Sequence, residues 1–458
     1  MTAASTNAAP AKGSMLRILG VSFGVAVALG ETIGAGIMRT PSQIANRLPS
    51  VWLIMLAWAL GALYSLLGAW SLAELGAMIP SSGAFYTVAR RAFGDYVGFV
   101  VGWTDWISLC GSAAAAAILV GELGLDLLAF LSHPILTGTT TAVAIALMQW
   151  RGIRWGSRFQ NVTSAITALV FFVLIAGAYL RPHHPPSADA AIAAIPSGLP
   201  LLFAIILVLQ AVIYTFDGWY GAFYFGDEII NPGREMPRSM LNGVLLLSTI
   251  YLLTNAALFH VLGAAGVARE NLPVAALGAS IFGEMGNTAV RALMVLSLAA
   301  LANGSILCAT RVLYAMSKDG WGARGIARVN RGGTPSVALF LTTLVTMVFL
   351  LSGSFNRVIA VTTFFFVAKY TMSYLAVFRL RKREPVTPRP YRAWGYPWTT
   401  AAAVGGSLAF LVGAIASDTR NSLYGLLVLL ASYPIYRLAR KSVRLTPARY
   451  SCSRRAGE

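Results

Sequence analysis

The sequence predicts an all-α polytopic membrane protein of about twelve transmembrane helices, arranged as a 5+5 inverted repeat with two extra helices. Three observations lead to this fold class. The 458 residues are 57% hydrophobic and 11% charged, with a mean hydropathy of +0.68, whereas soluble domains carry about 25% charged residues. Apolar runs of about 20 residues, the length that crosses a bilayer, recur along the chain. The first and sixth runs are interrupted at the same relative place.

The expected spans, numbered in chain order, lie near residues 17–46, 51–78, 96–124, 134–150, 159–180, 199–226, 238–265, 287–316, 336–353, 356–379, 397–416 and 421–440. Spans 1–5 and 6–10 each begin with an interrupted run, and an odd number of spans per half forces the second half to be inverted. The expected parts are a disordered cytoplasmic lead (1–15), one transmembrane domain (16–440, with repeat one about 16–180, repeat two about 199–380 and extra helices about 397–440), and a basic cytoplasmic tail (441–458). The apolar stretch Pro273–Phe282, between spans 7 and 8, is expected to form a short re-entrant or capping helix.

The net charge of +18 is compatible with a nucleic-acid-binding protein, but its distribution indicates a membrane topology instead. If the N-terminus is cytoplasmic, most Lys and Arg fall on the cytoplasmic side, including the run Arg379–Arg383 and the tail from Arg437 to Arg455. The outer loops keep few basic residues. This positive-inside bias predicts that both termini are cytoplasmic. We expect a bacterial inner (cytoplasmic) membrane protein that contacts lipid and does not bind nucleic acid.

The two interruptions are the most informative feature of the chain. Span 1 is broken at Gly30–Gly36, and span 6 is broken at Tyr214–Trp219. In hydrocarbon an unwound backbone survives only where it lines a cavity or is buried in protein. Broken helices at matching places in two halves are the best sequence indication of the binding site of a secondary transporter.

Four segments in the same order resemble a known family. They are Gly34-Ala35-Gly36-Ile37 with Thr40-Pro41, Ala73-Glu74-Leu75-Gly76 with Ser82–Tyr86, Phe216-Asp217-Gly218-Trp219 with Asp227–Pro232, and Asn303-Gly304-Ser305 with Arg311. Together they resemble the amino acid–polyamine–organocation superfamily, and more specifically its L-amino acid transporter branch. The resemblance covers about residues 16–440 and implies the LeuT-like fold. It also implies alternating-access movement of L-amino acids, as a symporter or an exchanger.

The breaks supply groups that suit an amino acid. The free N–H groups of Gly34, Ala35 and Gly36, at the start of a half-helix, suit a carboxylate. The resemblance places the ammonium group at backbone carbonyls of the two breaks, which include Thr32, Ile33, Tyr214, Phe216, Asp217 and the adjoining Gly218. The competing interpretation is that Gly30 and Gly34 form a small-residue packing face.

Two residues of the second break have alternative roles. Tyr214 lies at the aromatic gate position of the family, although an ordinary core aromatic is the alternative. Asp217 would either bind the ammonium group or cap backbone N–H groups.

Three charged residues within spans have open roles. Glu31 replaces a small or hydroxyl residue of the family, and an intramembrane carboxylate indicates function by default. It would carry a coupling proton, attract a cationic group, or pair with Lys369 or Arg39, since buried charges are normally paired.

The coupling ion is also open. Several family members carry a lysine in span 5 where this chain has Thr167. Thr167 would help to ligate Na⁺ with span-1 carbonyls and Ser305 or Thr310, or Lys369 would replace the missing lysine. Asn303 and Ser305 complete the gating or coupling candidates.

Other functional classes are less well supported. The sequence contains no catalytic constellation, and Cys110, Cys308 and Cys452 lack the spacing of a disulfide pair or a zinc site. We therefore expect no enzyme, no metal and no cofactor beyond a coupling H⁺ or Na⁺. Animal relatives use a cysteine after span 3 to join a glycoprotein, and none follows Cys110 before Cys308, so no disulfide-linked heavy subunit is expected. The alternatives are a cationic amine or polyamine transporter and a transport-dead amino acid sensor.

Overall fold

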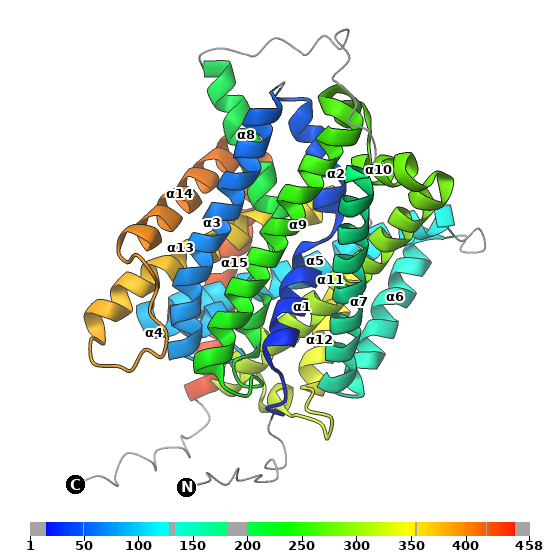
Figure 1. Cartoon of the computed structure of the whole chain (residues 1–458). Helices are drawn as coiled ribbons and strands as arrows, with labels where there is room; N and C mark the ends of the chain where they lie inside the picture. The colour runs from blue at the N-terminus through cyan, green and yellow to red at the C-terminus, as the bar shows by residue number, and fades with distance from the viewer. Residues whose placement is uncertain are drawn as a thin grey trace, which may run out of the picture.

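The computed structural model describes residues 15–48, 50–127, 133–180, 199–352, 355–417 and 419–444, and in these ranges the regular elements are helices (Figure 1). The α-helices are α1 (Val21–Thr32), α2 (Ala35–Ala45), α3 (Val51–Met78), α4 (Ala84–Phe93), α5 (Asp95–Leu127), α6 (Pro134–Trp150), α7 (Ile153–Tyr179), α8 (Leu199–Thr215), α9 (Pro232–Arg269), α10 (Pro273–Phe282), α11 (Glu284–Lys318), α12 (Ser336–Leu351), α13 (Phe355–Arg383), α14 (Trp398–Ser417) and α15 (Thr419–Arg444). Two 3₁₀-helices are η1 (Gly221–Phe225) and η2 (Arg324–Ala327). The expected disorder of the first residues and most of the basic tail lie outside the described residues.

The helix boundaries follow local sequence signals. The expected spans at 51–78 and 134–150 coincide with α3 and α6, and the expected short helix at Pro273–Phe282 is α10. The helix α9 begins six residues before the expected start of span 7, at Pro232, because a proline is preorganised for the first helical position. The helix α7 likewise begins at Ile153, directly after Gly152, whose φ of +138° suits glycine alone.

Five helices of the described residues are long and apolar enough to cross a membrane, namely α3, α5, α7, α9 and α11. The pair α1 and α2, bent by 48° at its break, counts as a sixth span. The remaining apolar helices are shorter, so the expected total of about twelve spans stays a prediction.

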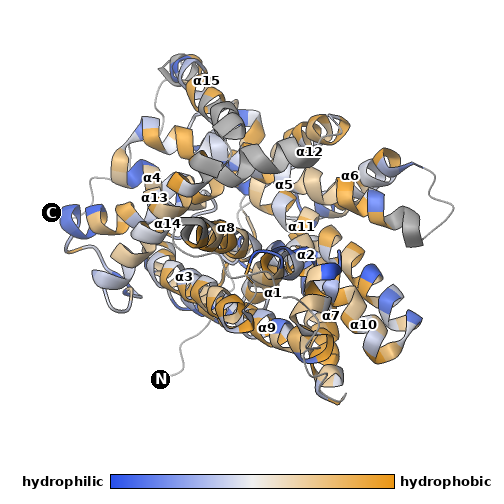
Figure 2. Ribbon diagram, turned by 90° about the horizontal axis from the view of Figure 1, so that it is seen from above, coloured by the Kyte–Doolittle hydropathy of each residue, from blue (hydrophilic) through white to orange (hydrophobic). Residues whose placement is uncertain are grey.

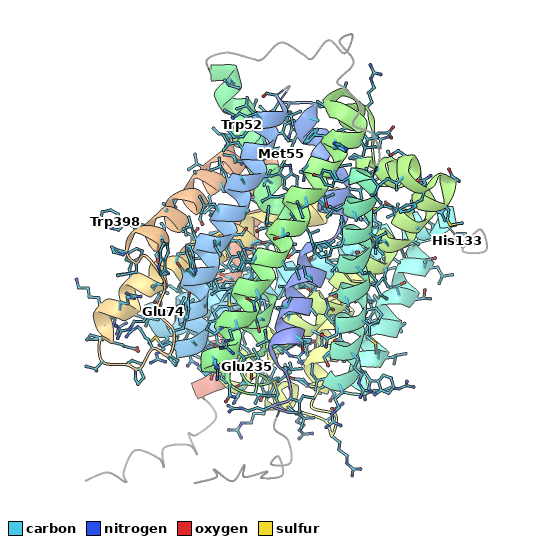
Figure 3. The ribbon with its side chains drawn as sticks, in the orientation of Figure 1. Trp52, Met55, Glu74, His133, Glu235 and Trp398 are labelled. Carbon is cyan, nitrogen blue, oxygen red and sulfur yellow. The ribbon has the colours of Figure 1, made fainter. Side chains whose placement is uncertain are left out.

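Lipid-facing stripes are visible on the outer helices. On α3 the exposed residues Trp52, Leu56, Leu60 and Leu63 recur at three- or four-residue intervals, which places them on one face. Figure 2 shows apolar residues on the outward faces of α3, α9 and α7. Figure 3 places Trp52 and Glu74 at opposite ends of α3, and the exposed apolar face occupies the half of this helix that contains Trp52.

The contacts between helices recur between the equivalent helices when the two halves are exchanged. The helix α1 packs on α9 as α8 packs on α3, and α5 packs on α13 as α11 packs on α7. The equivalent helices α3 and α9 contact each other, as do α5 and α11. In Figure 1, α1 starts at the lower end of the molecule and α8 starts at the upper end. These relations are those of an inverted repeat, so the predicted all-α transporter fold is confirmed.

Candidate functional site

The first break separates α1 from α2 in two residues. The Thr32 hydroxyl donates to the Ala28 carbonyl (2.7 Å) at the end of α1, and Ile33 then turns to an extended conformation. The helix resumes at Ala35, and no side chain caps its N-terminus at Gly34. Because the first N–H groups of a helix have no intrahelical partner, those of α2 are available to a ligand.

The second break lies directly opposite the first. The helix α8 ends at Thr215, and η1 begins at Gly221. Gly218 has a φ of +111°, and a Cβ there would lie 2.5 Å from the carbonyl oxygen of Glu31, so glycine is required by both conformation and contact. A Cβ on Gly36 would likewise lie 3.0 Å from Cγ2 of Thr215. The two breaks therefore pack backbone against backbone.

Tyr251 of α9 joins the two breaks. Its buried hydroxyl lies 3.1 Å from the carbonyl oxygen of Thr32 and 3.1 Å from that of Thr215. This single O–H group therefore donates to carbonyls at the ends of both α1 and α8. The Thr215 hydroxyl donates to that of Thr40 on α2 (2.9 Å). The sequence analysis missed Tyr251, because a tyrosine in an apolar helix carries no local signal of such a contact.

A cavity of about 330 Å³ lies at the junction of the breaks. Its lining comes from α1, the break and α2, from the end of α8, and from α5, α11 and α13. Along α2 it extends through Gly36, Arg39, Thr40 and Gln43, toward the upper end of Figure 1. The cavity therefore reaches toward the end of the molecule opposite the start of α1.

Not every residue expected at the site lines this cavity. Those that line it are Glu31, Thr32, Gly34, Ala35, Gly36, Tyr214 and Asp217. Of the others, Phe216 is buried against Trp58 and Tyr251, and Ile33 is also buried. Gly30 is a packing glycine, since a Cβ there would lie 1.8 Å from Nε2 of Gln160 on α7. The packing interpretation thus holds for Gly30, whereas Gly34 faces the cavity.

The coupling candidates also include residues beside the cavity and residues that face away from it. The carboxylate of Glu31 lies 3.1 Å from the Ser305 hydroxyl at its nearer oxygen. Asn303 faces away, where its amide group bonds Gln149 and Gln160 (3.0 and 2.7 Å). The Thr167 hydroxyl lies 3.2 Å from that of Ser297 on α11. Ser164, one turn earlier on α7, instead donates to a span-1 carbonyl, that of Ala26 (2.7 Å).

Lys369 has a different partner from the one considered. Its ammonium group donates to Asp105 of α5 (2.7 Å) and lies 3.1 Å from the Tyr224 hydroxyl, and all three side chains are buried. The rings of Phe85 and Tyr220 contact the same ammonium group. The hypothesis that Lys369 pairs with Glu31 is therefore wrong. Asp105, an intramembrane carboxylate, was the overlooked signal.

The remaining charges in the cavity have no ionic partner among the described residues. Asp217 accepts a hydrogen bond from the Tyr220 hydroxyl (3.2 Å). Arg39 lines the cavity one helical turn beyond Ala35 and makes no ion pair with a described residue. The cavity thus combines two carboxylates and one guanidinium with the N-terminus of α2.

The lower end of the molecule is closed by paired charges. Buried Glu228 forms a two-pronged ion pair with Arg311 of α11 (2.5 and 3.0 Å), and Asp227 accepts the Ser82 N–H (3.1 Å). Glu228 is thus paired with a cation of a distant helix.

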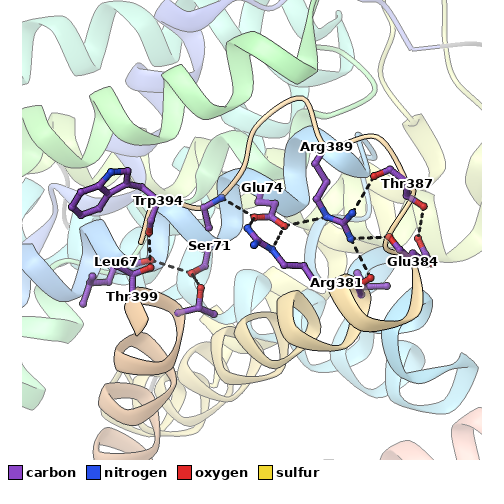
Figure 4. A network of polar contacts seen from close by, with 12 residues as sticks. Leu67, Ser71, Glu74, Arg381, Glu384, Thr387, Arg389, Trp394 and Thr399 are labelled. Carbon is purple, nitrogen blue, oxygen red and sulfur yellow. Dashed lines mark hydrogen bonds and ion pairs between the residues drawn. The ribbon is translucent and has the colours of Figure 1, made fainter. Parts of the chain in front are cut away.

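A second ion-paired cluster lies at the end of α3. The carboxylate of Glu74 binds Arg381 and Arg389 together with the Ala393 N–H (Figure 4). These contacts join α3 to α13 and to the segment before α14. Arg91 binds Glu384 nearby and holds the pKa of that carboxyl below its ordinary range.

Comparisons with known proteins agree with this geometry. The amino acid permease family profile matches residues 19–432. The chain is 26% identical to the serine/threonine exchanger SteT of Bacillus subtilis over 91% of this chain and 95% of that protein. It is 25% identical to mouse b(0,+)-type amino acid transporter 1 (83% of this chain, 79% of that one). It is 24% identical to the human cystine/glutamate transporter (91% and 83%).

The profile match covers most of the chain and includes both breaks. The expected resemblance to the L-amino acid transporter branch is confirmed by these relatives. The expectation that the chain is not an enzyme is confirmed as well, because the family and the relatives are transporters. The chain is therefore a multi-pass membrane protein that belongs to the amino acid permease family of the amino acid–polyamine–organocation superfamily.

Proposed function

We propose that this protein moves L-amino acids across the bacterial cytoplasmic membrane by alternating access, with the cavity at the two breaks as its substrate site. The observation that carries the proposal is the pairing of an uncapped helix N-terminus with carboxylates in one cavity. An amino acid needs both, because its carboxylate and its ammonium group leave water together. Gly34, Ala35 and Gly36 present the N–H groups without side-chain obstruction.

The ammonium group is expected at the acceptors of the cavity. Glu31 and Asp217 supply carboxylates, and the neighbouring backbone carbonyls supply weaker acceptors. The Thr32 carbonyl already accepts a hydrogen bond from Tyr251, which leaves one of its two lone pairs. We therefore expect the two carboxylates to contribute more to ammonium binding than that carbonyl does.

The lining of the cavity leaves room for the side chain of an amino acid. Ser112, Ala115 and Ala116 of α5 leave space beside the breaks, while Leu298 and Leu301 of α11 limit it. The relative SteT is named a serine/threonine exchanger. L-serine and L-threonine are therefore the first substrates to test, and obligatory exchange is the first transport mode to test.

The packing of the lower end supports an outward-facing state. Tyr220, Phe223, Tyr224 and Phe225 are buried below the breaks. The two ends of the described chain, at α1 and α15, lie on that closed side in Figure 1. With cytoplasmic termini, as the positive-inside bias predicts, the cavity faces outward. Rocking of the two halves would then open the closed side.

The accompanying assignments are part of this proposal. The transport cycle needs no cofactor other than a coupling H⁺ or Na⁺, and the protein works without a disulfide-linked heavy subunit. Cys110 and Cys308 are both buried, so neither is placed to form such a link.

Uptake into proteoliposomes tests the proposal. The purified protein is assayed with a labelled L-amino acid panel, with and without internal amino acid, a pH gradient and a Na⁺ gradient. Uptake that requires internal amino acid identifies an exchanger, and uptake driven by an ion gradient identifies a symporter. Binding without flux would favour the sensor, and neither binding nor flux of any amino acid would overturn the proposal.

A second candidate is a cationic amine transporter, which the two cavity carboxylates favour. Competition by ethanolamine, which is L-serine without its carboxylate, separates the two. An amino acid site that uses the N-terminus of α2 loses most of its affinity for ethanolamine, whereas an amine site retains it.

A further inference from the structure

Glu31 is a carboxylate with an unusual environment. Its side chain points from the end of α1 toward α11, and its hydrogen-bond partner among the described side chains is the Ser305 hydroxyl, at 3.1 and 3.4 Å from its two oxygens. A Cβ on Gly304 would lie 2.0 Å from one carboxylate oxygen, so the glycine leaves the space that the carboxylate fills. The carboxylate is therefore held in a fitted position beside the cavity.

The charged groups around Glu31 do not neutralise it. Among the described residues, the titratable and charged side chains on the packed elements include Asp217, Tyr220, Lys369, Cys308, Tyr251 and, along the cavity, Tyr214 and Arg39. The charge of Lys369 is balanced by its ion pair with Asp105 (2.7 Å). Asp217 lines the same cavity and, when ionised, carries the same sign as Glu31. An ionised Glu31 would thus be a carboxylate in a membrane interior without a cation in contact, which is costly.

The other cavity carboxylate differs. Asp217 accepts the Tyr220 hydroxyl (3.2 Å), and the Tyr220 ring contacts the Lys369 ammonium group. A cation thus lies one side chain away from Asp217, whereas the hydroxyl that contacts Glu31 belongs to Ser305. Glu31 is the carboxylate whose charge depends on what occupies the cavity.

We propose that Glu31 holds a proton in the empty cavity and releases it when the ammonium group of an amino acid binds beside it. The carboxyl O–H bond breaks, the proton passes to the water of the cavity, and an ammonium N–H takes its place as donor to the carboxylate. The inference rests on the proposed function and adds the identity of the group that exchanges proton for substrate.

The exchange has a directional consequence. A carrier that crosses the membrane empty also carries the Glu31 proton, so net uptake of amino acid is coupled to proton movement in the opposite direction. Obligatory exchange, in which an ammonium group occupies the site on both crossings, moves no proton and responds to no pH gradient.

Calorimetry of L-serine binding to the purified full-length protein tests the inference. Titrations at one pH in phosphate and in Tris, which differ in their ionisation enthalpy, give the number of protons released. The wild type is expected to release up to about one proton per L-serine bound. Glu31→Gln should bind L-serine without releasing a proton, and Glu31→Asp should restore the release. The exposed Glu284 gives the matched control, since Glu284→Gln should leave the proton count unchanged.

Each outcome decides a different question. Equal proton release by Glu31→Gln and the wild type would assign the proton to another group and overturn the inference. Binding by the wild type without proton release would overturn it as well, while leaving the proposed function standing. Failure of L-serine and every other L-amino acid to bind would overturn the proposed function.

A second measurement covers a Glu31→Gln variant that does not fold. The affinity of the wild type for L-serine should then rise with pH, by up to about tenfold per pH unit while Glu31 is protonated in the empty protein. An affinity that does not change with pH would overturn the inference. L-lactate, which has a hydroxyl in place of the ammonium group of L-alanine, should show no such rise if it binds.

Discussion

The cavity and the closed lower end differ in whether their buried carboxylates form ion pairs. At the lower end, buried Glu228 and Glu74 each contact a basic side chain. In the cavity, Glu31 and Asp217 contact only hydroxyl groups among the described side chains. Paired charges fix an arrangement because separating them is costly, whereas charges without a partner are available to a ligand. The difference indicates which end is locked in this conformation and which is prepared for a substrate.

Breaking the buried pair at the lower end is expected to have the largest effect. Arg311→Ala would leave Glu228 as an uncompensated buried charge, which destabilises by about 3–5 kcal/mol. The measurement is thermal unfolding of the purified protein. The double variant Arg311→Met with Glu228→Gln should recover most of the loss, and a stable single variant would show that this pair does not hold the closed end.

Filling the contact between the breaks should stop transport. Gly36→Leu places a side chain against Thr215, where even a Cβ would lie 3.0 Å from Cγ2. Because overpacking costs about 1–3 kcal/mol, uptake of L-serine should fall by about tenfold or more. The matched control is Gly405→Leu on α14, since a Cβ at Gly405 meets nothing within 4 Å. Equal uptake by both variants would remove Gly36 from the site.

Removing the hydroxyl that joins the breaks should have a smaller effect. Tyr251→Phe deletes the donor shared by the Thr32 and Thr215 carbonyls, a hydrogen bond worth about 0.5–1.5 kcal/mol. The affinity for L-serine, measured by calorimetry, should fall several-fold. Tyr179→Phe on the exposed end of α7 is the control. An unchanged affinity in Tyr251→Phe would mean that the two breaks are held by backbone packing alone.

The smallest effect is expected outside the membrane. Arg91 lowers the pKa of Glu384, so their pair stabilises the fold at neutral pH and loses this contribution as Glu384 is protonated in acid. Because both side chains are partly exposed, Arg91→Gln should cost about 0.2–1 kcal/mol at neutral pH. Unfolding temperatures of both proteins should converge toward acid pH and in high salt. A constant difference would contradict the electrostatic origin.

The breaks and the helices could be predicted from sequence because their signals are local. Gly34 and Gly218 mark unwound backbone, and hydropathy marks α3 and α6 to the residue. The partners of charged side chains could not be predicted from sequence, because these partners depend on how distant helices pack. Lys369 and Asp105 are 264 residues apart, and Arg311 and Glu228 are 83 apart.

The placement of site residues shows the same division. A motif gives the position of a residue along its helix but not the direction of its side chain. Asn303 and Ser305 belong to one motif, yet Asn303 bonds to α6 and α7 while Ser305 contacts Glu31. Thr167 was placed with span-1 carbonyls by the expected start of span 5, and the structure gives that contact to Ser164.

The most direct test of the substrate site is protection of a cavity thiol. Ser112→Cys places a thiol in the cavity lining, in a background where Cys452→Ser removes the cysteine of the tail and Cys110 and Cys308 are buried. A membrane-impermeant thiol reagent is applied from the side that the cavity faces, and labelling is measured with and without saturating L-serine or L-threonine. The account predicts that the thiol is labelled and that at least one of these amino acids protects it. Labelling that no L-amino acid slows would contradict the assignment of the cavity as the substrate site.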